Sequence, residues 1–245
     1  MLFRSIDVTF PLGMLTVITG VSGSGKSTLV KKILYPALQK QLTGFGDKPG
    51  QFTELKGNYS NVKHIEFVDQ NPIGRSSRSN PVTYIKAYDD IRALYSKQKL
   101  SAIRNYQAKH FSFNVDGGRC ETCKGEGSVT IEMQFMADVH LECETCKGKR
   151  FKKEVLEVTF ANKNIDDILS MTIDDAIAFF DENGVSKIKN KLQPLQDVGL
   201  GYVALGQSSS TLSGGEAQRV KLAAELAKKS TGNTFYILEI GRAHV

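Results

Sequence analysis

The sequence predicts an α/β fold in which strands and helices alternate around a glycine-rich turn. Three adjoining segments support this prediction: a β-branched apolar run at Met14–Thr19, the glycine-rich run Gly20–Ser27 (GVSGSGKS), and a segment with helical spacing over Thr28–Leu34. A strand that ends in a tight turn and leads into a helix is the repeating unit of parallel α/β sheets. We therefore expect a mostly parallel sheet that includes Met14–Thr19 as a buried strand.

The remaining segments continue the alternation. The strand-like runs share β-branched or alternating apolar residues: Ile6–Phe10, His64–Val68, Glu154–Phe160 and Thr234–Leu238. The helical segments share apolar residues spaced three and four apart: Val82–Gln98, Ser170–Phe180 and Glu216–Lys229. Thr172 is suited to cap the second of these helices, ahead of Asp174 and Asp175.

Length and composition are those of an ordinary globular protein with a basic surface. The 245 residues can bury one large core, or a core with a small appended module. No apolar run approaches the roughly 20 residues needed to cross a bilayer, and no signal peptide follows Met1. We expect a cytoplasmic chain with no membrane partner. The net charge of +6 suits a polyanionic partner, and a solvated basic surface explains it equally well.

The glycine-rich run has the chemistry of a phosphate-binding loop. Gly20, Gly23 and Gly25 let the backbone approach an anion closely, and N–H groups of the following helix point toward it. Lys26 can reach the β- and γ-phosphates, and the Ser27 hydroxyl can ligate Mg²⁺. Because a strand, this turn and a helix occur in that order, we expect the chain to bind a nucleoside triphosphate.

All four cysteines form two Cys-x-x-Cys pairs, Cys120/Cys123 and Cys143/Cys146. Two such knuckles supply four thiolates in the tetrahedral arrangement that suits Zn²⁺. Four thiolates leave no open coordination position, so the expected role of the metal is structural. A redox dithiol is the competing interpretation. His140, between the pairs, is expected at the surface rather than as a fifth ligand. Between the two cysteine pairs, residues alternate in character along 127–135 and again along 138–142. This pattern predicts a hairpin with these two segments as its arms.

A third motif lies at the start of the last helix. In Leu212–Arg219 (LSGGEAQR), Ser213 is placed as an N-cap, and Gly214 and Gly215 leave helix-start N–H groups open to a γ-phosphate. A Ser-Gly-Gly helix start is a weak signal alone. It becomes strong beside a phosphate loop about 190 residues upstream.

The order of these motifs, with Gln70 in a glutamine loop between them, resembles an ATP-binding-cassette (ABC) ATPase head. The inserted cysteines narrow the resemblance to the C-terminal nucleotide-binding half of the UvrA family, the damage-recognition subunits of bacterial nucleotide excision repair. The stretches that carry the resemblance are Ile18–Thr28, Pro72–Pro81, Phe111–Cys123 and Gly206–Leu222. The implied fold is an ABC-type P-loop ATPase head with an inserted four-cysteine zinc module and a helical signature region.

The resemblance implies a role for each matching residue. ATP and Mg²⁺ would be held by Gly20, Gly23, Gly25, Lys26, Ser27 and Thr28. Gln70 would sense the γ-phosphate. The ATP bound by an opposing cassette would be covered by Ser213, Gly214 and Gly215. Zn²⁺ would be bound by Cys120, Cys123, Cys143 and Cys146.

The implied partners are damaged double-stranded DNA, a second copy in a homodimer, and a UvrB-like helicase subunit. The family reads distorted duplex rather than sequence, so phosphate contacts and DNA deformability should dominate affinity. The candidate DNA contacts are named for their positive charge alone, and each is as compatible with a solvated surface position as with a DNA contact: Arg75, Arg78, Arg119, Lys124 and Lys149.

The implied organisation has four parts. These are the first part of the cassette core (1–110), the zinc-binding module (111–151), the signature region with the return to the core (152–238), and a non-native tail (239–245). After Leu238 the family pattern has Asp-Glu-Pro, where the Asp orients Mg²⁺ and the Glu polarises the attacking water. Here Glu239 is the one carboxylate at that place, and the catalytic candidates are Gln70 and Glu239. We expect this chain to hydrolyse little or no ATP.

Two other classes of function compete with the repair ATPase. The run Cys120–Gly127 resembles a zinc repeat of J-domain chaperones, which predicts binding of unfolded protein and leaves the phosphate loop unexplained. A transporter-type or translation-type cassette shares the phosphate loop and signature but lacks the cysteine module. Zinc-dependent binding to damaged DNA favours the first reading, peptide binding the second, and copurification with a membrane subunit the third.

Overall fold

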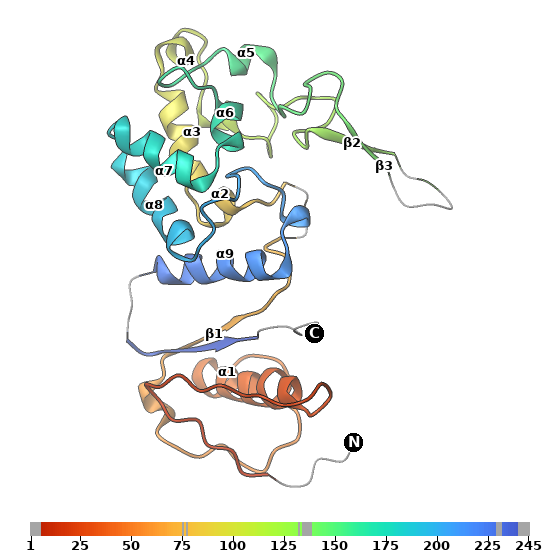
Figure 1. The fold of residues 1–245 in the computed structure, drawn as a ribbon, viewed down its shortest axis with the longest axis vertical. Helices are drawn as coiled ribbons and strands as arrows, with labels where there is room; N and C mark the ends of the chain where they lie inside the picture. The colour runs from red at the N-terminus through yellow and green to blue at the C-terminus, as the bar shows by residue number, and fades with distance from the viewer. Residues whose placement is uncertain are drawn as a thin grey trace. The chain divides into compact units, whose positions relative to one another are not determined.

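The computed structural model describes residues 6–74, 76, 78–131, 133, 139–228 and 232–239 (Figure 1). The chain divides into two compact units. Unit 1 comprises Met1–Phe67 with Thr231–Val245, and unit 2 comprises Val68–Ser230. In the described ranges, no helix combines the length and apolar character needed to cross a bilayer.

Unit 1 holds the glycine-rich loop, a helix and a two-stranded sheet. Its elements in chain order are a π-helical stretch at Thr28–Leu34, α1 (Tyr35–Thr43), a 3₁₀ turn at Tyr59–Asn61, β1 (His64–Val68) and β4 (Thr234–Leu238). β1 pairs with β4, although they lie far apart in sequence. Leu34 and Leu38 from the helical side and Ile237 of β4 form the buried centre of this unit.

Unit 2 is largely helical. Its helices are α2 (Pro81–Tyr84), α3 (Tyr88–Ser96), α4 (Lys99–Ile103), α5 (Lys153–Leu156), α6 (Ile165–Ser170), α7 (Ile173–Glu182), α8 (Ser186–Asp197) and α9 (Gly214–Leu226), with 3₁₀ turns at Ala108–Phe111 and Ser209–Thr211. They surround a core with five fully buried aromatic side chains: Tyr95, Phe111, Phe113, Phe151 and Phe180. The buried Tyr88 hydroxyl donates a hydrogen bond to the Phe111 carbonyl at 2.7 Å.

The cysteine module interrupts the helices of unit 2 with an antiparallel hairpin. β2 (Ser128–Ile131) pairs with β3 (Val139–Glu142), and Val129 lies opposite Leu141. Figure 1 shows the two strands extending away from the helices. A bridge between Arg119 and Phe151 closes the base of the module. The ring of Phe151 packs at a centroid distance of 6.3 Å against Phe113 in the core, so the module is anchored to the helical part of unit 2.

Several predicted elements are confirmed. Strands lie at His64–Val68 and Thr234–Leu238, and β2–β3 is the predicted hairpin, of whose expected arms residues 132, 134, 135 and 138 lie outside the described residues. Thr172 caps α7, because its side chain accepts a hydrogen bond from the Asp175 amide at 3.1 Å. The predicted last helix is α9. The four-part division of the chain stays a prediction.

The strands expected at Ile6–Phe10 and Met14–Thr19 are wrong. Both runs are irregular in the structure, and Leu15 is 89% exposed rather than buried. A strand persists only where a neighbour accepts and donates its ladder hydrogen bonds. In the described ranges the sheets are β1–β4 and β2–β3, each with two strands, in place of the expected larger parallel sheet.

Two further expectations differ from the structure. The segment Glu154–Phe160 is expected as a strand. Its first residues, through Leu156, belong instead to the helical turn α5. The helix expected over Val82–Gln98 is divided into α2 and α3, because Lys86 between them has φ of 59°, which no helix residue adopts. Asn80 caps α2 by accepting from the Thr83 amide at 3.0 Å.

Candidate metal centre and nucleotide motifs

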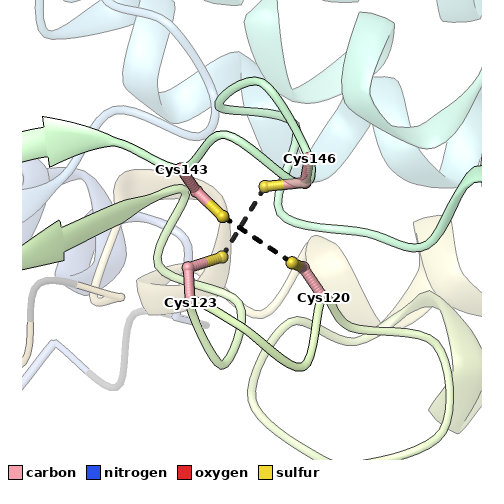
Figure 2. A group of neighbouring side chains, drawn as sticks. All are labelled: Cys120, Cys123, Cys143 and Cys146. Carbon is pink, nitrogen blue, oxygen red and sulfur yellow. Dashed lines mark hydrogen bonds between the residues drawn. The ribbon is translucent and has the colours of Figure 1, made fainter.

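Four cysteine side chains converge at the base of the hairpin. Figure 2 shows their sulfur atoms pointing toward a common centre, two from each knuckle loop. The four sulfurs all lie within 4.8 Å of one another, and all four residues are buried. The distance from Cys120 Sγ to Cys143 Sγ is 3.9 Å, and that from Cys123 Sγ to Cys146 Sγ is 3.6 Å.

These distances fit one tetrahedral metal ion. Zinc–sulfur bonds of about 2.3 Å give sulfur–sulfur edges of about 3.8 Å in a tetrahedron. The observed separations of 3.6 and 3.9 Å lie on either side of that value. Four thiolates are the donor set that Zn²⁺ prefers in closed structural sites, so the cysteines fit the predicted ion.

The two knuckles repeat the same backbone. In each, the residue after the second cysteine is a lysine whose φ is 50°. The glycine that follows this lysine also has a positive φ. The hydroxyls of Thr122 and Thr145, at equivalent places, lie 2.9 Å apart. The sequence Cys-Glu-Thr-Cys-Lys-Gly therefore folds twice into the same turn, and the two turns face each other across the four sulfurs.

Backbone amides surround the sulfurs and favour thiolate at some positions. Burial opposes ionisation of Cys143, but hydrogen bonds from the N–H groups of Cys146 and Thr145, together with those from the thiols of Cys146 and Cys120, outweigh it and lower the pKa of Cys143 to about 7. Burial raises the pKa of Cys123, although the Gly127 amide donates to its sulfur at 3.3 Å. Burial likewise raises the pKa of Cys146. A cation at the centre would offset the cost of the remaining thiolates.

The phosphate-loop candidates lie in unit 1. The Lys26 ammonium folds back into its own loop, where it donates to the carbonyl oxygens of Gly20 at 2.6 Å and Val21 at 2.8 Å. Ser27 immediately precedes the helical stretch and makes no capping hydrogen bond with its hydroxyl. Phosphate oxygens would compete with these carbonyls for the lysine. Gly20, Gly23, Gly25 and Thr28 lie in the same loop and helix start, and their nucleotide role stays a prediction.

Glu239 also lies in unit 1, directly after β4. Its carboxylate is 3.4 Å from the ammonium of Lys31 on the helical stretch. Lys31 in turn lies 5.5 Å from the ring centre of Phe67. The structure thus gives Glu239 an ion-pair partner, while its catalytic role stays a prediction.

The signature motif begins α9 with a full capping box. The Ser213 hydroxyl accepts from the Glu216 amide at 3.3 Å, and the Glu216 carboxylate accepts from the Ser213 amide at 2.7 Å. The Tyr202 hydroxyl donates to Glu216 at 2.7 Å and, with the Ser213 amide, lowers the pKa of this carboxyl. Arg219 donates to the Tyr202 hydroxyl at 3.2 Å. Tyr202 is not among the site residues predicted from the sequence, and the Gly201-Tyr202 turn before the motif was the available signal.

Gln70 lies beside the signature helix within unit 2. A Cβ added to Gly214 would meet the Gln70 side chain and carbonyl at 3.3–3.5 Å. The Gln70 amide donates to Gln218 of α9 at 3.5 Å. The preceding residue, Asp69, pairs with Lys221 of the same helix at 2.5 Å. The structure therefore brings the glutamine loop and the signature motif together, and Gly215 at the helix start faces open space in the described structure.

The DNA-contact candidates have different surroundings. Arg119 bonds Asp116 at 2.7 Å and is largely covered, so it serves the module's own loop. Arg78 donates to the Lys124 carbonyl at 3.4 Å. Lys124 and Lys149 are exposed. Arg75 lies outside the described residues. Contact of these residues with DNA stays a prediction.

The fold and the motifs define a class of protein: an ABC-type ATPase head with an inserted four-cysteine module. A solved structure supports this class, the crystal structure of UvrA2 from Deinococcus radiodurans. It matches with a TM-score of 0.86 and 47% identity over 95% of this chain and 27% of that one. No protein-family model matches the chain.

Curated relatives show which protein this chain is similar to. UvrABC system protein A from Clostridium acetobutylicum is 55% identical over 236 residues, that from Clostridium tetani 56%, and that from Bacillus subtilis 53%. Each match includes 96% of this chain. The chain is therefore similar to UvrABC system protein A over nearly its whole length. It spans about a quarter of the length of these relatives, 24–25%.

Proposed function

We propose that this chain supplies the nucleotide-binding and zinc-binding parts of a UvrA-type nucleotide excision repair protein, in its C-terminal half. The observation that carries the proposal is 53–56% identity over 236 residues to UvrABC system protein A. The four sulfurs at one tetrahedral centre support the zinc part independently. The relatives favour this interpretation over the chaperone and transporter alternatives.

Within this proposal Zn²⁺ is structural. Cys120, Cys123, Cys143 and Cys146 would bind it with no position left for substrate or water. What the metal supplies is a fixed base for the hairpin β2–β3, whose strands leave and rejoin the two knuckles. Exposed Lys124 and Lys149 beside the knuckles then offer charge to a phosphate backbone.

ATP would bind at the Gly20–Ser27 loop, with Lys26 leaving its loop carbonyls for phosphate oxygens and Ser27 ligating Mg²⁺. The signature residues Ser213–Gly215 would cover the nucleotide of an opposing cassette, so ATP would rearrange a dimer of the whole protein. Because the loop and signature of one cassette serve different composite sites, we expect little or no turnover by this chain alone. Damaged duplex DNA and a UvrB-like helicase are the proposed partners.

Anisotropy of a labelled duplex with and without a bulky lesion tests the proposal. The zinc-loaded chain should bind the lesion duplex more tightly, and the preference should be lost in Cys143→Ser. Equal binding of both duplexes, or binding that does not depend on zinc, would contradict the DNA part. A labelled unfolded peptide in the same assay tests the chaperone alternative, for which peptide binding would be the stronger signal.

A further inference from the structure

Two loops of unit 2 that are remote in sequence are joined through one buried serine. Ser209, in the loop that leads to the signature helix, is 4% exposed. Its amide donates to the Ser79 carbonyl at 2.7 Å, and its hydroxyl lies 3.3 Å from the carbonyls of Gly74 and Ser76. Ser209 therefore joins the end of the glutamine loop to the start of the signature loop by hydrogen bonds.

Arg150 connects the cysteine module to the same signature loop. Its carbonyl accepts from the Cys120 amide at 2.8 Å, and its backbone amide bonds the Cys146 sulfur. Its guanidinium donates to the Gly206 carbonyl at 3.1 Å and lies 5.6 Å from the ring centre of Phe113. One residue thus contacts a cysteine of each knuckle through its backbone and the signature loop through its side chain.

The position of Arg150 is unusual for an arginine. Its φ is 68°, a conformation that favours glycine. The side chain is half-buried, and Gly206, which it contacts, also donates its amide to the Leu169 carbonyl at 2.7 Å. The start of the signature loop is therefore held from two sides, by α6 and by the module.

Arg78 makes a second connection from the glutamine loop. Its guanidinium donates to the carbonyl of Lys124, the residue directly after Cys123, at 3.4 Å. It also lies 3.9 Å from the Glu126 carboxylate, and both side chains are about one third exposed, at 29% and 33%. Arg78 therefore joins the glutamine loop to the first knuckle, and Arg150 joins the module to the signature loop.

We propose that Arg150 and Arg78 are positioning residues through which the metal-ordered cysteine module fixes the signature and glutamine loops. A bound metal holds the knuckles rigid, and charge-assisted hydrogen bonds extend that order from Arg150 to the Gly206 carbonyl of the signature loop and from the Lys124 carbonyl to Arg78 of the glutamine loop. The inference rests on the proposed function only in assigning those loops to ATP. The physical connection can be tested with no nucleotide or DNA present.

Hydrogen exchange of the 245-residue chain, followed by mass spectrometry, is the test. Zinc-loaded Arg150→Met keeps a long apolar stem over Phe113 but loses the donor. Amides of residues 206–211 should then exchange about tenfold faster, a loss typical of one charge-assisted hydrogen bond. Removing zinc from the wild-type chain should produce a similar increase, and removing it from Arg150→Met should add little there. Amides of α8 should be unchanged in every case.

Arg104→Met is the matched control. Arg104 also donates to a backbone carbonyl, that of Glu154 at 2.8 Å, and pairs with Glu157. Its loss should leave residues 206–211 unchanged. Unaltered exchange of these residues in zinc-loaded Arg150→Met would overturn the role of Arg150. So would a full additional response to zinc removal in that variant.

Zinc content of each variant is measured first. If Arg150→Met does not retain zinc, Arg78→Met decides the question, because no backbone group of Arg78 belongs to the module. Faster exchange at the Ser209 amide in zinc-loaded Arg78→Met supports the proposal, and no change there refutes it. Failure of damaged-DNA binding would contradict the proposed function while leaving this exchange result intact.

Discussion

Gly125→Ala should damage the cysteine site far more than Gly148→Ala, although the two glycines hold equivalent places in the two knuckles. Their φ angles are similar, 86° and 75°. Their surroundings differ. A Cβ on Gly125 would lie 2.0 Å from the carbonyl oxygen of Phe113, whereas a Cβ on Gly148 would first meet the flexible Glu142 side chain at 3.7 Å.

The expected cost follows from these two facts. Alanine in the left-handed conformation costs roughly 1–2 kcal/mol at either position. At Gly125 the knuckle or the Phe113 backbone must also move by more than about 1 Å to reach normal contact, and overpacking of this kind costs roughly 1–3 kcal/mol. Phe113 is fully buried, so it cannot easily give way. Gly125→Ala should therefore lower the free energy of unfolding by about 2–5 kcal/mol, and Gly148→Ala should lower it by about 1–2 kcal/mol.

Two measurements check this difference. Urea unfolding of the zinc-loaded variants gives the free energy of unfolding, and competition with a chromogenic chelator gives zinc affinity. A gap of about 2 kcal/mol corresponds to about a 30-fold weaker affinity for Gly125→Ala. Equal losses in the two variants would refute the reasoning, because they would mean that the contact with Phe113 carries no cost.

Three further perturbations have direct readouts. Cys143→Ser should reduce zinc content from one ion per chain to near zero, and full retention would argue against a four-thiolate site. Lys26→Ala should weaken binding of a fluorescent ATP analogue by about tenfold or more without changing zinc content, and unchanged affinity would remove the loop from the proposed site. Burial opposes ionisation of Asp90, but hydrogen bonds from Lys187 and Lys191 hold its pKa below the ordinary value. The ion pairs should therefore stabilise the fold above pH about 3.9 and lose this effect as the pH falls through the lowered pKa. In an acid titration followed by circular dichroism, Asp90→Asn should reduce the loss of stability that occurs below pH about 3.9. An unaltered titration would contradict this role of the ion pairs.

The cysteine site could be predicted because its signal is local. Two Cys-x-x-Cys pairs specify their own turns, and the lysine and glycine after each pair supply the positive φ angles. The caps were equally local, since Thr172 and Ser213 bond amides only three residues further on. Such features depend only on residues within a few positions of one another, so the local sequence is enough to predict them.

The irregular and helical segments could not be predicted in the same way. Met14–Thr19 has the composition of a buried strand, but pairing depends on a neighbouring segment that composition does not reveal. In 154–160, Leu156, Val158 and Phe160 alternate as in a strand, whereas the residues that are buried, Val155 and Val158, have the spacing of three typical of a helical turn. Arg150 stood among basic residues of the module, and nothing local to it indicates its long-range contact with Gly206.

The pairing of the two knuckles makes the hairpin β2–β3 a loop clamped at its base. The chain leaves the four sulfurs after Cys123 and returns to them at Cys143, so both ends of the hairpin lie at the sulfur centre. Lengthening such a loop costs little, since each doubling adds only about 0.6 kcal/mol of closure entropy. The hairpin can therefore change in length and sequence during evolution while the helices beneath it stay the same.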